Sequence, residues 1–96
     1  MHTVIRHYSG AGASELADQI SAQAEGVEAG IRSVPGVISY ALVKTVDGCI
    51  SITVCEDKVG ADQSVKVAAE FVRDNCTAQA RPPVVSEGET IIHFRT

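Results

Sequence analysis

The stretch Ser33–Glu56 constrains the fold most, because it holds a helix stop, two β-branched runs and the turn between them. Asp47-Gly48 separates the two runs, and a type I′ turn needs positive φ at both central residues, which Asp followed by Gly tolerates. The sequence therefore predicts a β-hairpin with these two residues as its loop. In that register Val46 lies opposite Cys49, and the pairing of every later residue follows.

The two faces of this predicted hairpin are both mixed in polarity. One face, the Tyr40 face, carries Ile38, Tyr40, Leu42, Lys44, Ser51, Thr53 and Cys55. The other, the Ile52 face, carries Ser39, Ala41, Val43, Thr45, Ile50, Ile52, Val54 and Glu56. A sheet with one solvated side segregates apolar from polar residues more cleanly. We therefore expect both faces to be covered, the Ile52 face by helices and the Tyr40 face by a second copy of the chain.

Composition excludes several classes of protein. The chain has 96 residues and a formal charge of −4, with only two Phe and two Tyr, so the basic surface and stacking aromatics of a nucleic-acid binder are absent. No stretch approaches the roughly 20 apolar residues of a membrane span, and the N-terminus lacks a signal-peptide pattern. We expect a cytoplasmic protein. The three cysteines have no CxxC spacing, which favours buried reduced thiols over a metal site.

The rest of the chain predicts one α+β domain over residues 1–96. A strand is expected at His2–Ser9 and a long amphipathic helix at Ser14–Val34, where apolar residues recur at helical spacing. A second helix is expected at Ala61–Cys76, a connection at Thr77–Thr90 and a last strand at Ile91–Arg95. This β-α-β-β-α-β order predicts a ferredoxin-like antiparallel sheet of order 4-1-3-2, with both helices on one face.

The run Val34–Leu42, with its Pro-Gly-x-x-Ser-Tyr segment, resembles the small dimeric α+β barrel proteins of the antibiotic biosynthesis monooxygenase family. The resemblance implies a homodimer whose two sheets pack face to face, and a cavity between each subunit's sheet and helices that takes the ligand. The catalytic quinol and haem-degrading members use an Asn on the first strand, a Trp at the end of the third and, in the haem type, a His on the second helix. This chain has no Trp, its only Asn is Asn75, and Glu56 stands about where that Trp would be.

Two pairs that involve the first strand are candidate site residues. His7 and His93 fall on strands that the predicted order makes neighbours, so they are candidates for ligand or proton binding or are simply structural histidines. Arg6 shares the opposite face of its strand with Tyr8. That pair is a candidate for binding an anionic or phenolic ligand or for packing in a dimer interface.

The Ile52 face supplies the other candidates. If it packs against the helices, Ser39, Ala41 and Glu56 line the expected pocket. A carboxylate beside an apolar cavity has a raised pKa and can act as a general base, which makes Glu56 a weak catalytic candidate. The alternative is an exposed acid at a strand end beside Asp57.

Taken together, the sequence predicts a homodimer that binds a small, mostly apolar organic molecule between sheet and helices. Any catalysis is expected to be a monooxygenase-like oxidation, or an isomerisation, without cofactor or metal. The alternative is a non-catalytic interaction or regulatory module, in which the ligand sits between subunits. The place where the ligand binds distinguishes the two hypotheses.

Overall fold

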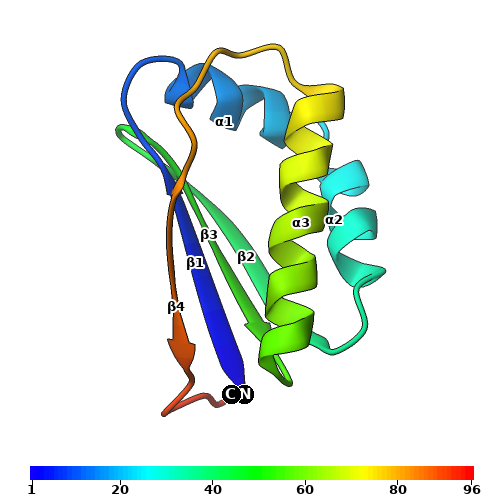
Figure 1. Cartoon of the computed structure of the whole chain (residues 1–96). Helices are drawn as coiled ribbons and strands as arrows, with labels where there is room; N and C mark the ends of the chain where they lie inside the picture. The colour runs from blue at the N-terminus through cyan, green and yellow to red at the C-terminus, as the bar shows by residue number, and fades with distance from the viewer.

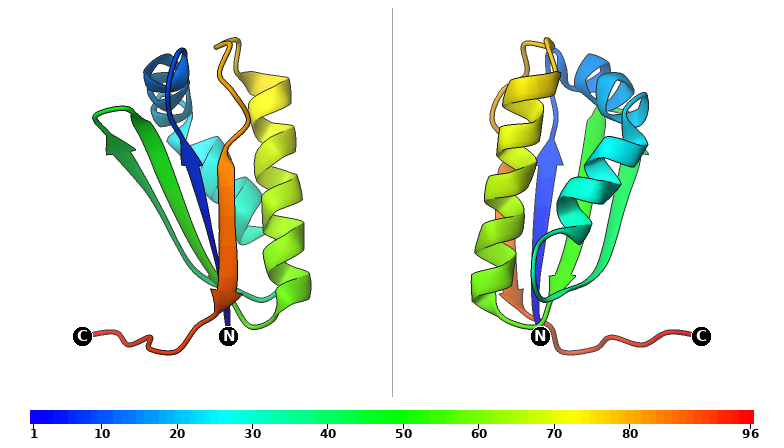
Figure 2. Two further views of the ribbon diagram at one scale, coloured as in Figure 1. Left: turned by 60° about the vertical axis from the view of Figure 1, so that its left-hand side comes forward. Right: turned by 90° about the vertical axis from the view of Figure 1, so that its right-hand side faces the viewer.

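The computed structural model describes residues 1–96 and shows one four-stranded antiparallel sheet with its helices on one side (Figures 1 and 2). The elements are β1 (His2–Tyr8), α1 (Ala13–Ser21), α2 (Ala24–Arg32), β2 (Val37–Thr45), β3 (Gly48–Cys55), α3 (Lys58–Asn75) and β4 (Val84–Glu89). The strand order is β2-β3-β1-β4, which is the predicted order read from the opposite edge. The ferredoxin-like fold class is therefore confirmed. No helix combines the length and the apolar character needed to cross a membrane.

The hairpin forms as predicted, but its turn lies one residue earlier. Thr45 pairs with Gly48, so Val46 and Asp47 form the loop and Gly48 begins β3. Gly48 is buried, and a Cβ atom there would lie 2.1 Å from the Tyr8 carbonyl oxygen. The close approach of β1 therefore requires glycine at this place in the strand. From Ser39 to Thr45 each pairing shifts by two residues, so these residues keep their predicted faces. Between Val37 and Ser39 the register is irregular, and Val37 pairs with Cys55.

The expected covering of the two faces is wrong. The Tyr40 face packs under the helices, where Thr53 is only 3% exposed, whereas Ile52 on the opposite face is 37% exposed. β1 determines this orientation, since its residues Val4 and Tyr8 are buried on the helix side and pair with Thr53 and Cys49. Two mixed faces carry little contrast in hydrophobicity, so the hairpin alone cannot specify which side the helices cover.

The long first helix is divided in two. α1 ends at Ser21 and α2 begins at Ala24, and between them Gln23 leaves the helical conformation. The Gln23 side chain donates to the carbonyl oxygen of Asn75, at 3.0 Å, and to that of Gln19, at 3.2 Å. The division follows from contacts with the end of α3, which a helical periodicity cannot reveal. The predicted apolar stripe is otherwise buried at Leu16, Ile20, Ile31 and Val34.

α3 begins at Lys58, three residues before the expected start, because Asp57 is its N-cap. The Asp57 carboxylate accepts from the backbone N–H of Gly60 at 3.0 Å.

The last strand is also misplaced by the sequence prediction. β4 covers Val84–Glu89, inside the expected connection, and residues 90–96 have no regular secondary structure. β4 pairs with β1 at the sheet edge, where polar and glycine residues are tolerated. The more strongly β-forming residues Ile91, Ile92 and Phe94 lie exposed in the tail, which runs away from the body of the molecule (Figure 2).

The hydrophobic core is divided into two clusters at opposite ends of the sheet. The larger contains Tyr8, Ala13, Leu16, Ala17, Ile20 and Cys49, and the smaller contains Val4, Cys55 and Ala61. Arg6 lies between Val4 and Tyr8 on β1 and belongs to neither cluster. The middle of the helix-covered face is therefore the part that apolar packing fills least.

Candidate functional site

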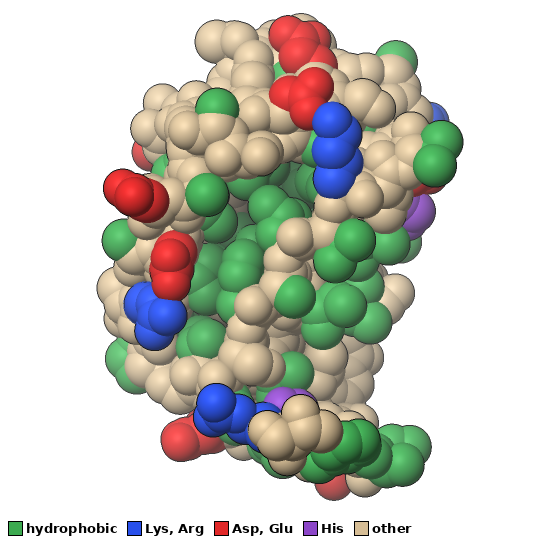
Figure 3. All heavy atoms as spheres, turned by 180° about the vertical axis from the view of Figure 1, so that it is seen from behind, with side chains coloured by type: hydrophobic (Ala, Val, Ile, Leu, Met, Phe, Trp, Pro, Cys, Tyr) green, Lys and Arg blue, Asp and Glu red, His purple; other side chains and the backbone are tan.

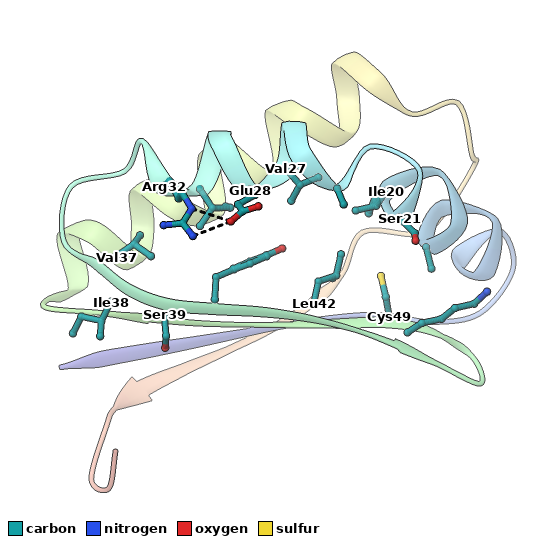
Figure 4. A pocket seen from close by; sticks show the side chains of 15 residues that line it. Ile20, Ser21, Val27, Glu28, Arg32, Val37, Ile38, Ser39, Leu42 and Cys49 are labelled. Atoms are coloured by element: carbon teal, nitrogen blue, oxygen red, sulfur yellow. Dashed lines mark hydrogen bonds and ion pairs between the residues drawn. The ribbon is translucent and has the colours of Figure 1, made fainter. Parts of the chain in front are cut away.

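A cavity of about 520 Å³ opens between the helix pair α1–α2 and the edge strand β2. Figure 3 shows it as a hollow with hydrophobic side chains in its interior, and Figure 4 shows Leu42 and Cys49 pointing into it from the sheet. The lining is mostly apolar and includes Ile20, Val27, Ile31, Val37, Tyr40, Leu42 and Cys49. We call this space the outer cavity.

Charged side chains occur only among the residues at the margin of the outer cavity. On α2, Arg32 donates to Glu28 at 2.8 Å, an ion pair drawn in Figure 4. Lys44 of β2 also lines the cavity and pairs with Asp18 of α1. Both pairs are well exposed, so each contributes little to stability. The charged side chains at the mouth of the outer cavity are therefore paired with one another, and its interior offers mainly apolar contacts.

A smaller recess of about 30 Å³ adjoins the outer cavity on the side of β1 and α3. The two spaces share Ile20, Val27, Ile31, Tyr40 and Leu42 as wall residues. The recess is closed by Phe71 and Val67 of α3 and has Arg6, Tyr8 and Ser51 on the sheet side. We call it the inner recess. Its volume is that of about one water molecule.

Arg6 is the one charged side chain of the inner recess, and it is only 6% exposed. Its Nη2 donates to the Tyr8 hydroxyl at 2.8 Å, and its Cζ lies 5.4 Å from the centre of the Tyr8 ring. Its Nε is buried without a hydrogen-bond partner. Every ion pair in the structure joins other residues, so the guanidinium has no carboxylate partner. Burial without a counterion is costly for a group that stays charged in proteins.

Both tyrosines of the chain line the inner recess, and burial raises the pKa of each phenol above its ordinary value. The positive charge of Arg6 opposes this shift in the pKa of both Tyr8 and Tyr40. Burial likewise raises the pKa of the Cys49 thiol, with Arg6 again opposing. At neutral pH these groups are therefore uncharged, and the recess keeps the positive charge of Arg6.

The structure brings only part of the predicted site together. Arg6 faces the helices as a wall of the inner recess, on the side of the sheet opposite to the one expected to hold the pocket. Ser39 lies beside the outer cavity, but Figure 4 shows its side chain pointing away from the helices. Ala41 pairs with Ile52 on the open face of the sheet and lines neither space. These placements follow from the reversed covering of the sheet.

The histidines and Glu56 lie outside both spaces. His7 is on the open face of β1, with its Nε2 3.5 Å from Asp47, and His93 is in the C-terminal tail. The expectation that they occupy neighbouring strands is wrong, because β4 ends at Glu89. Glu56 is exposed, and its backbone N–H donates to the Gly36 carbonyl at 2.8 Å. Its predicted position beside an apolar cavity is therefore not observed.

Tyr40, Leu42 and Cys49 are the lining residues that the sequence prediction assigned elsewhere. They were expected at a subunit interface, because the hairpin was placed with the wrong side toward the helices. The alternation of β1 places Val4, Arg6 and Tyr8 on one side and Thr3, Ile5 and His7 on the other. Each side holds apolar and polar residues, so this pattern gives no clear signal of which side the helices cover.

Comparisons with known proteins find similarity in structure alone. No protein-family model matches the chain, and no curated protein matches it in sequence. MupZ from Pseudomonas fluorescens aligns over 90% of this chain and 65% of its own, with a TM-score of 0.69 at 12% identity. This chain thus spans slightly less than two thirds of MupZ.

Two other solved structures align over nearly the full length of both chains. A monooxygenase from the gene ActVA-Orf6 of Streptomyces coelicolor, in complex with nanaomycin D, has a TM-score of 0.65 at 17% identity and covers 99% of this chain and 90% of its own. An antibiotic biosynthesis monooxygenase has a TM-score of 0.62 at 14% identity, and the alignment covers 96% of this chain and 100% of that protein. The chain has the fold of the antibiotic biosynthesis monooxygenase-like proteins. At these identities the likeness establishes the fold.

Proposed function

We propose that this protein binds a small, mostly apolar organic molecule in the outer cavity. The observation that carries the proposal is the cavity itself, about 520 Å³ in volume and lined by fifteen residues, ten of them hydrophobic. Ligand pockets of proteins have volumes of roughly 300–1,000 Å³ and mostly apolar walls. The nanaomycin D complex of the Streptomyces coelicolor monooxygenase supports an organic ligand for this fold.

The position of the cavity favours this proposal over a regulatory module with ligand between subunits. The walls come from α1, α2, β2 and β3 of a single chain, so one copy supplies the whole lining. A ligand at a subunit interface would instead lie against the open face of the sheet. The two hypotheses therefore predict binding on opposite sides of the sheet.

Filling the cavity tests the proposal directly. Ala24 lines the outer cavity, whereas Ala29 is exposed on the same helix and lines neither space. We expect Ala24→Phe to weaken binding of nanaomycin D at least tenfold in calorimetric titration, because the ring occupies the ligand's space. Ala29→Phe is the matched control and should bind like the wild type. Equal affinity in Ala24→Phe, or no binding by the wild type, would contradict the proposal.

We propose oxidation of the bound molecule, without a cofactor, as the activity. The neighbours described as monooxygenases support this reaction class. The measurement is oxygen uptake with a naphthoquinol as substrate. Uptake faster than the uncatalysed rate, and reduced in Ala24→Phe, supports an enzyme. Tight binding with no uptake favours a non-catalytic binding protein.

We also propose that residues 1–96 act as one domain of a cytoplasmic homodimer, with the open face of the sheet as the interface. That face is lined by Thr3, Ile5, His7, Ala41, Val43, Ile50, Ile52, Val84 and Ser86. Ile5, Val43, Ile52 and Val84 are exposed on it, and none of these nine residues is Lys, Arg, Asp or Glu. An apolar face without charges is complementary to a second copy of itself.

A further inference from the structure

We propose that Arg6 is an anion-binding residue at the closed end of the cavity, so that the ligand is an organic acid whose ionised oxygen enters the inner recess. This inference rests on the proposed function, because it assigns the chemical class of the ligand in the same cavity. It goes beyond that function by naming one residue as the determinant of specificity.

The first argument is the unbalanced charge. Arg6 is 6% exposed, has no carboxylate partner, and has an Nε with no hydrogen-bond acceptor. Its one side-chain partner is the neutral hydroxyl of Tyr8. A buried guanidinium in this state is stabilised by any anion that reaches it, and an oxyanion also supplies the missing acceptor.

The second argument is access and size. The inner recess adjoins the outer cavity across five shared wall residues, so a ligand in the outer cavity reaches Arg6 by displacing side chains of that shared wall. At about 30 Å³ the recess admits an oxygen-bearing group but not a ring. The apolar body of the ligand must therefore stay in the outer cavity. A carboxylate, phenolate or enolate oxygen on a flat apolar body has this shape.

The third argument is the absence of competing charge in the walls. Tyr8, Tyr40, Ser51 and Cys49 surround the recess or its entrance, and none is anionic at neutral pH. The ion pairs at the mouth are exposed and already balanced. Arg6 is thus the charged group that discriminates an acid from a neutral molecule of the same shape.

The test compares an acid with an uncharged analogue of equal size. 2-Naphthoate and 2-naphthamide are titrated calorimetrically into the wild type and Arg6→Met at neutral pH. We expect the wild type to bind the acid roughly 10- to 100-fold more tightly than the amide, the range for a hydrogen bond to a charged group. Arg6→Met should lose this preference while its affinity for the amide is unchanged. 2-Naphthol, titrated below and above its own ionisation, distinguishes a phenolate from a carboxylate ligand.

Two further variants keep the test decisive. Arg73→Met removes an exposed cation of α3 that lines neither space and should retain the preference for the acid. Arg6→Lys keeps the positive charge but lacks the Nε donor, so it should retain part of the preference for the acid. This variant tests the role of Arg6 if Arg6→Met does not fold. A melting temperature of Arg6→Met equal to or above that of the wild type supports a binding role, since a structural arginine would lower it.

The outcomes separate this inference from the proposed function. Equal affinity of the wild type for acid and amide overturns the role of Arg6 and leaves the cavity as a ligand site. A preference that persists in Arg6→Met also overturns it. If the wild type binds neither naphthalene probe nor nanaomycin D, the proposed function fails, and this inference fails with it.

Discussion

At the scale of single residues, strand alternation makes Arg6 the exceptional side chain of this protein. Its neighbours Val4 and Tyr8 on the same side of β1 begin the two core clusters, and Arg6 falls between them under the helices. Such a position is ordinarily apolar. In the free protein its charge is balanced by no carboxylate and its one side-chain partner is the Tyr8 hydroxyl, which is the pattern expected where a site is kept for a ligand.

The tyrosines provide a spectroscopic test of this environment, because the chain has no Trp and both of its Tyr residues line the inner recess. Burial raises both phenol pKa values above their ordinary 10.0. The stability that the neutral phenols contribute is therefore complete below pH 10 and is lost as the pH rises through the folded-state pKa. We expect ultraviolet difference absorbance of the folded protein to titrate above 10.0 for both phenols.

The same titration in Arg6→Met should move further upward. Arg6 lowers the pKa of both phenols, so removing its charge removes the opposing effect. Arg32→Met, which lies at the mouth, is the control and should leave the titration unchanged. A folded-state midpoint at or below the ordinary value would show that the phenols are not buried as described.

The three thiols should differ in reactivity. Cys49 and Cys55 are buried, whereas Cys76 is half-buried at the end of α3. Burial raises the pKa of all three thiols, and the thiolate is the reactive form. We expect iodoacetamide to modify Cys76 before Cys55, with Cys55 reacting only on unfolding, as followed by peptide mass spectrometry. Early modification of Cys55 would contradict the packing of the smaller core cluster.

At the scale of elements, the close approach of α2 and α3 defines the roof over the inner recess. Gly26 and Gly30 lie one helical turn apart on α2 and face Phe71 and Val67 of α3. These side chains of the neighbouring helix lie 3.4 and 3.6 Å from the ideal Cβ positions of the two glycines.

Gly30→Ala should stabilise the protein. The added methyl would lie 3.6 Å from Val67 Cγ1, an ordinary contact, and glycine inside a helix costs about 0.5–1 kcal/mol relative to alanine. Urea unfolding should show a gain in the free energy of unfolding of about that size. Gly48→Ala is the opposite control, because its Cβ would meet the Tyr8 backbone at 2.1 Å. A loss of stability in Gly30→Ala would mean that α2 and α3 pack more closely than described.

At the scale of the whole molecule, the sheet has one side covered by its own helices and one side with exposed apolar residues. The open face holds Ile5 and Ile52 at the centre of the sheet, where they pair across β1 and β3. A chain of 96 residues gains appreciable stability from covering such a surface. In the proposals made here, the helix-covered side of the sheet binds the ligand and the open side forms the dimer interface.

The charge variant Ile52→Glu should separate these two functions. A carboxylate at the centre of the open face would be desolvated in a dimer, so we expect monomers by multi-angle light scattering where the wild type gives dimers. Val59→Glu, on the exposed surface of α3, is the control and should remain dimeric. Binding of 2-naphthoate should persist in Ile52→Glu, because the cavity lies on the other side of the sheet. A monomeric wild type would contradict the interface.

Much of the fold could be predicted because its determinants are local. The β-branched runs, the apolar stripe from Leu16 to Val34 and the Pro35-Gly36 stop predict the elements and their order, and right-handed crossovers then fix the strand order. The errors arose where distant contacts override local preference. Gly48 is moved into β3 by its contact with Tyr8, and Gln23 interrupts a helix through its bond to Asn75.

The sequence by itself determined the element order, the two mixed faces of the hairpin and the placement of Arg6 on the same side of β1 as Val4 and Tyr8, since each depends on neighbours along the chain. Only the tertiary structure decided which face the helices cover. That choice depends on packing between segments far apart in the sequence. It removed Glu56 and the two histidines from the candidate site, kept Arg6 with Tyr8, and added Tyr40.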